Sequence, residues 1–209
     1  MKQDSNNEIT INEENPQILN DYLKAVRDDD KGRIDRASEA LAVYIIRKVN
    51  DAIEVLYKND AFLLANKMSE MTICGRLAMY LQEEFKDFKG YYIDTEYYRL
   101  KVPRENANLK KDRIRCDILF HSRGIFNSRI DNLLAIEAKM EDSTDDGEKD
   151  IKRLADFVLP EPTDSHKDTI HSTLVGLFLR FGEKCHAARI TPVDINVSLE
   201  DNNDNKEET

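Results

Sequence analysis

Two short apolar segments interrupted by charged residues, 114–121 and 133–139, constrain the fold most. The first alternates with a period of two, which predicts a strand. Its expected faces are Ile114, Cys116, Ile118 and Phe120 on one side, and Arg115, Asp117, Leu119 and His121 on the other. The second segment is apolar until Glu137 and Lys139, so it predicts a buried strand that ends in two charges.

These charges suit metal-assisted hydrolysis of a phosphate ester. Residues two apart on a strand share a face and lie roughly 6–7 Å apart, so Glu137 and Lys139 project together. Asp117 joins them if the two strands are neighbours. Carboxylates bind Mg²⁺, which keeps several waters and accepts phosphate oxygens. A bound cation lowers the pKa of its water, and a nearby lysine can orient that water and offset developing charge.

Asp117, followed by Glu137-Ala138-Lys139 at the end of an apolar strand, resembles the PD-(D/E)XK motif of the restriction-endonuclease-like nucleases. The match includes Arg123-Gly124 and 132–134 and covers roughly residues 60–181. It departs from the family pattern at Cys116, where proline is usual, although that position is not a metal ligand. The resemblance implies an α/β fold: a restriction-endonuclease-like core with a central mixed sheet flanked by helices, here with extra N-terminal helices.

The resemblance also implies a function and a site. The chain is expected to be a Mg²⁺-dependent nuclease that hydrolyses phosphodiester bonds in DNA, with Mn²⁺ able to replace Mg²⁺. Asp117, Glu137 and the backbone of Ala138 would bind the metal, and Lys139 would orient the attacking water. Glu70 would be a further catalytic acid, since many family members place a glutamate on the helix before the sheet.

Two glutamates have alternative interpretations from the residues alone. Glu70 falls on the inward face of a predicted helix, residues 69–88, where it either points at the site or interacts with the positive end of the helix dipole. Glu96 lies on a predicted strand, residues 91–99, and is either an additional acid of the site or an outward salt-bridge partner.

The net charge of −10 is concentrated near the two ends of the chain. Residues 1–30 and 193–209 each contribute −5, and the residues between them balance. Within that part, residues 99–115 hold seven bases and two acids, a basic stretch that either binds phosphates or is a solvated loop. The predicted nucleic-acid-binding residues are Arg99, Lys101, Lys110, Lys111, Arg113 and Arg115.

The rest of the chain divides by composition and periodicity. We expect a disordered acidic tail at 1–15, a helical segment at 16–67, the nuclease-like core at 68–190 and a second acidic, disordered tail at 193–209. Further elements are predicted at 149–158, a helix, and at 174–181, a buried strand. Lys152 and Arg153 of that helix either contact phosphate or, as is commoner, lie on a solvated face. Three scattered cysteines and the lack of a long apolar run favour a cytoplasmic protein without a membrane span or signal peptide.

Two alternatives stay open. Glu137 and Lys139 can form a structural ion pair, although a metal accounts for Asp117 as well. The whole chain can also be a non-catalytic binding or scaffold protein that acts through its N-terminal helices. Those helices would support a homodimer under either interpretation.

Overall fold

The computed structural model describes residues 11–100, 113–123, 130–158 and 173–190. Four helices come first: α1 (Gln17–Arg27), α2 (Lys31–Asn59), α3 (Ala61–Ala65) and α4 (Glu70–Glu84). Strands β1 (Tyr92–Leu100), β2 (Arg113–His121) and β3 (Asn132–Met140) follow. Helix α5 (Glu148–Val158) then leads to β4 (Val175–Phe181) and β5 (Cys185–Ile190). The predicted α/β class with N-terminal helices is therefore confirmed.

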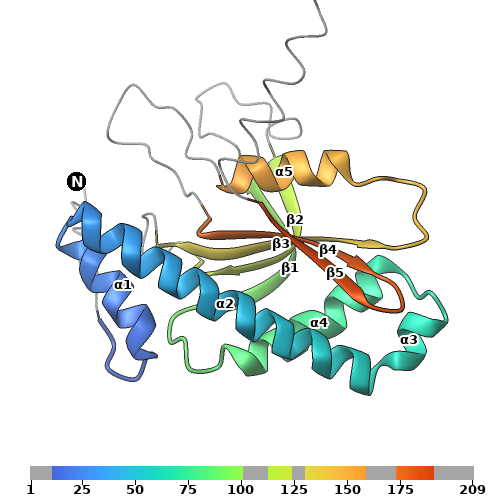
Figure 1. The fold of residues 1–209 in the computed structure, drawn as a ribbon, viewed down its shortest axis with the longest axis horizontal. Coiled ribbons are helices and arrows are strands. Elements are labelled where there is room, and N and C mark those ends of the chain that lie inside the picture. The colour runs from blue at the N-terminus through green and yellow to red at the C-terminus, as the bar shows by residue number, and fades with distance from the viewer. Residues whose placement is uncertain (1–10, 101–112, 124–129, 159–172, 191–209) are drawn as a thin grey trace, which may run out of the picture.

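The five strands form one mixed sheet in the order β1-β2-β3-β4-β5. Only the β3–β4 pair is parallel, and α5 makes the crossover between these two strands. Figure 1 shows α5 on one face of the sheet, and α1, α2 and α4 on the other. Strand β5 was not predicted; it pairs antiparallel with β4.

The helical layer shares one core with the sheet. Buried residues recur along α2 at helical spacing, from Leu41 to Leu56, and they belong to the same cluster as Leu77 of α4 and Ile136 of β3. The segments 16–67 and 68–190 expected from the sequence are thus packed against each other.

An aromatic cluster fixes the end of α4 against β2. The Phe120 ring stacks on Phe85 with centroids 4.4 Å apart, and its centroid lies 5.4 Å from that of Phe88 and 5.5 Å from that of Tyr91. Helix α4 ends at Glu84, so Phe85 and Phe88 follow the helix instead of completing it to 88. This packing sets the position of the whole helix, and therefore of its first residue, Glu70.

Two local expectations are wrong. Residues 11–15, predicted to be disordered, form a turn in which the buried Asn15 accepts a hydrogen bond from the backbone N–H of Lys89 at 2.6 Å. Cys116 does not share a face with Ile118 and Phe120: it packs in the cluster on the α5 side of the sheet, whereas they pack on the helical side. Glu96 has φ +54° and lies with Asp117 between the pairs Thr95–Ile118 and Tyr97–Cys116, where the β1–β2 register skips a pair, so the regular alternation is interrupted at this point.

Candidate active site

The predicted residues lie where β2 and β3 meet the first turns of α4 and α5. Backbone pairing between β2 and β3 reaches Ile118 and Ile136. Next to that pair, the Asp117 carboxylate accepts a hydrogen bond from the backbone N–H of Ala138 at 2.8 Å. The side chain of Asp117 thus joins the two strands directly beside Glu137.

Both carboxylates are buried. Asp117 is 6% exposed and Glu137 is 1% exposed. Burial, followed by the negative charge of Asp117, raises the pKa of Glu137 to about 8, although Arg153 acts in the opposite direction. A second cation beside Asp117 and Glu137, in addition to Arg153, would stabilise both carboxylates in their ionised form.

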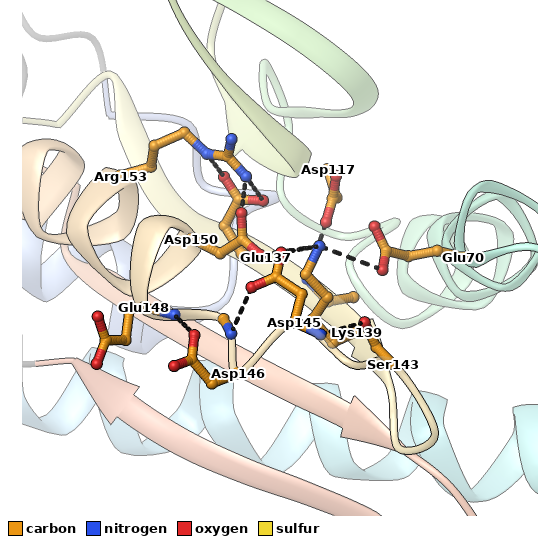
Figure 2. A network of polar contacts seen from close by, with 12 residues as sticks. Glu70, Asp117, Glu137, Lys139, Ser143, Asp145, Asp146, Glu148, Asp150 and Arg153 are labelled. Carbon is orange, nitrogen blue, oxygen red and sulfur yellow. Dashed lines mark hydrogen bonds and ion pairs between the residues drawn. The ribbon is translucent and has the colours of Figure 1, made fainter.

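Lys139 follows on the same strand and is surrounded by acids. Its Nζ lies 3.0 Å from Asp150 Oδ2 and 3.7 Å from both Glu70 Oε2 and Asp145 Oδ2. Figure 2 shows these side chains reaching the lysine from α4, from α5 and from the turn before α5. The side chain of Lys139 is 16% exposed, so it is mostly enclosed by these partners.

Glu70 enters the cluster because it is the first residue of α4. Ser69 caps the helix by accepting a hydrogen bond from the backbone N–H of Thr72 at 3.3 Å. Burial and, to a lesser degree, the charge of Asp117 raise the pKa of Glu70, whereas Lys139 opposes the shift. Of the two interpretations of Glu70, its contact with Lys139 supports the one that points it at the site.

Two residues of α5 complete the cluster. Arg153 donates to Glu137 from Nε at 3.0 Å and from a terminal nitrogen at 3.3 Å. It also pairs with Asp150, which is buried. Arg153 is partly exposed, as a residue on a solvated face would be, but its guanidinium also covers the Glu137 carboxylate, which the sequence did not indicate. The i, i+3 spacing of Asp150 and Arg153 was visible in the sequence, but the side of α5 that meets β3 was not.

The remaining predicted residues are less closely placed. Glu96 pairs with Arg115, so its carboxylate makes the salt bridge that the sequence offered as an alternative. Arg115 is the one predicted nucleic-acid-binding residue with a described side chain. The predictions for Lys101, Lys110 and Lys111 lie outside the described residues, as do those for the side chains of Arg99 and Arg113.

The donor set fits Mg²⁺ better than a metal that needs several protein ligands. Within the described ranges no three His, Cys, Asp or Glu side chains gather as a metal cage. Mg²⁺ binds through one or two carboxylates and retains waters, which Asp117 and Glu137 satisfy. Cys74, buried nearby, is not a competing nucleophile, because burial and the charge of Asp117 raise the pKa of its thiol.

Comparisons with protein-family descriptions, curated proteins and solved structures find no match for this chain. None of the helices in the described part of the chain is long and apolar enough to cross a membrane.

Proposed function

We propose that this chain is a divalent-metal-dependent nuclease with a restriction-endonuclease-like core, acting on DNA. The observation that carries the proposal is the meeting of Glu70, Lys139 and the Asp117–Glu137 pair at one point, although they come from three different elements. The topology supports it, since a helix, three antiparallel strands, a crossover helix and a parallel strand follow in that order.

In this mechanism Asp117 and Glu137 would hold the metal, and the Ala138 carbonyl would be a further ligand by resemblance. When bound, Mg²⁺ lowers the pKa of a coordinated water and polarises the phosphoryl oxygens. Lys139 orients the attacking water through its ammonium and offsets charge that develops on the phosphate. Glu70, 3.7 Å from Lys139, helps to hold that ammonium in position.

The competing function is a scaffold that keeps this fold without catalysis. The same cluster favours it in one respect, because each charge has an internal partner: Glu137 has Arg153, and Lys139 has Asp150. A metal-free scaffold requires no further cation. Metal binding therefore separates the two proposals.

The test combines calorimetric Mn²⁺ titration with cleavage of supercoiled plasmid and of single-stranded RNA. We expect wild type to bind Mn²⁺ and cut DNA, Asp117→Asn to lose both, and Lys139→Ala to bind Mn²⁺ without cutting. Glu70→Gln should reduce cutting less than Lys139→Ala.

Asp142→Asn is the matched control. Asp142 is an exposed acid three residues beyond Lys139 that pairs with Lys67 instead of the cluster, so its loss should change neither readout. Wild-type protein that binds no divalent metal and cuts neither nucleic acid would contradict the nuclease function and favour the scaffold function.

A further inference from the structure

Arg153 occupies both oxygens of the Glu137 carboxylate. Its Nε lies 3.0 Å from Oε1, and a terminal nitrogen lies 3.3 Å from Oε2. This two-point geometry is the strong form of an arginine–carboxylate pair, and it uses one lone pair on each oxygen, the pair of positions that a metal ion chelated by both oxygens would need. A guanidinium and a divalent cation cannot both hold Glu137 in this way.

The two partners differ in exposure. The side chain of Glu137 is 2% exposed, whereas that of Arg153 is 39% exposed. The guanidinium therefore forms the solvent-facing cover of an otherwise enclosed carboxylate. It can leave toward solvent without unpacking the sheet.

Asp150 provides a second contact for Arg153. It lies one turn earlier on α5, is 4% exposed, and pairs with both Arg153 and Lys139. An arginine that releases Glu137 can keep this contact, so its charge stays close to the site. Asp150 also holds Lys139 at 3.0 Å, which makes it a positioning residue for that lysine.

We propose that Arg153 is an internal cation that competes with the divalent metal for Glu137, so that a metal held by both Glu137 oxygens displaces Arg153 from them while Arg153 keeps its pair with Asp150. The inference rests on the proposed function, because it concerns metal bound at Glu137. It adds a regulatory contact, since occupancy of the site depends on the strength of one arginine–carboxylate pair.

The test compares Mn²⁺ affinity by calorimetry in wild type, Arg153→Gln, Arg153→Lys and Lys152→Gln, all at the same ionic strength. Arg153→Gln should bind Mn²⁺ about tenfold more tightly, because the competing charge-assisted pair is gone. Arg153→Lys keeps the charge but loses the two-point geometry, and should show a smaller gain. It also serves if Arg153→Gln does not fold.

Lys152→Gln is the matched control. Lys152 is exposed and precedes Arg153 on α5, so the substitution Lys152→Gln removes the same charge without changing a contact of Glu137. Screening should limit its effect to less than about twofold. Equal tightening in Lys152→Gln and Arg153→Gln would show a general charge effect and overturn the proposal.

The remaining outcomes separate this inference from the proposed function. Wild type that binds Mn²⁺ while Arg153→Gln binds it equally or more weakly overturns the competition and leaves the metal site intact. Binding by Arg153→Gln alone supports the competition. No Mn²⁺ binding by any of the four proteins overturns the competition and the metal site together.

Discussion

The buried carboxylate of Glu137 should make the metal-free protein less stable as pH rises. Its pKa is raised from 4.5 to about 8 in the folded protein. The folded protein therefore holds this proton more tightly than the unfolded chain does. The resulting penalty is absent below about pH 4.5, grows as pH rises toward 8 and is constant above it.

The magnitude follows from the size of the shift. At about 1.4 kcal/mol per pKa unit, ionisation of Glu137 in the folded protein costs on the order of 3–5 kcal/mol of unfolding free energy. Glu137→Gln removes the titration and nearly keeps the side-chain volume. In EDTA, the stability of wild type relative to this variant should therefore fall by that amount between pH 5 and pH 9.

The assay is urea unfolding in EDTA at pH 5, 7 and 9. Glu141→Gln, at an exposed glutamate just beyond β3, should follow the wild-type pH dependence and serves as the control. Saturating Mg²⁺ should recover much of the wild-type loss at pH 9, since the cation binds the ionised carboxylate. Parallel pH curves for wild type and Glu137→Gln would show that Glu137 does not titrate with a raised pKa in the folded protein.

Three further variants, two of them with a control variant, test the packing around the site by urea unfolding. Gly147→Ala should lower the free energy of unfolding by about 2–4 kcal/mol, because Gly147 has φ +84° and a Cβ would lie 2.4 Å from the Phe178 ring. Its control is Gly75→Ala, where a Cβ meets nothing within 4 Å, and this variant should gain up to about 1 kcal/mol. Equal effects of the two substitutions would contradict this prediction. Asp150→Asn should lose about 1–3 kcal/mol by removing the shared anion of Arg153 and Lys139; an unchanged midpoint would show that the contact is unimportant. Phe120→Ala should lower the free energy of unfolding by about 3–5 kcal/mol, whereas its control Phe62→Ala, at a side chain 73% exposed, should lower it little. Similar losses in the two variants would contradict the placement of Phe120 in the core.

The sequence alone was sufficient to predict the helix and strands that carry the site. The apolar run before Glu137 predicted β3, and the alternation from 114 to 121 predicted β2. The apolar stripe of α4 predicted that Glu70 lies on the inward face of this helix, where its carboxylate lies 3.7 Å from Lys139. These predictions succeeded because each depends on a local period that one buried face imposes.

Other features depend on contacts between distant segments. Strand β5 is mostly exposed at residues 186–188 and has little β-branched content, so no local pattern predicted it. The displacement of Cys116 to the opposite face occurs beside Asp117, opposite the positive φ of Glu96 on another strand. The pairing of Arg153 with Glu137 requires knowing which side of α5 meets β3.

Anomalous diffraction from crystals of the wild-type protein soaked in Mn²⁺ tests the central claim most directly. We expect one strong anomalous peak, from a Mn²⁺ ion within bonding distance of the carboxylates of both Asp117 and Glu137, with the Arg153 guanidinium withdrawn from Glu137. Crystals that show no peak between these two carboxylates, or Mn²⁺ only at exposed acids such as Glu141 and Asp142, would contradict it.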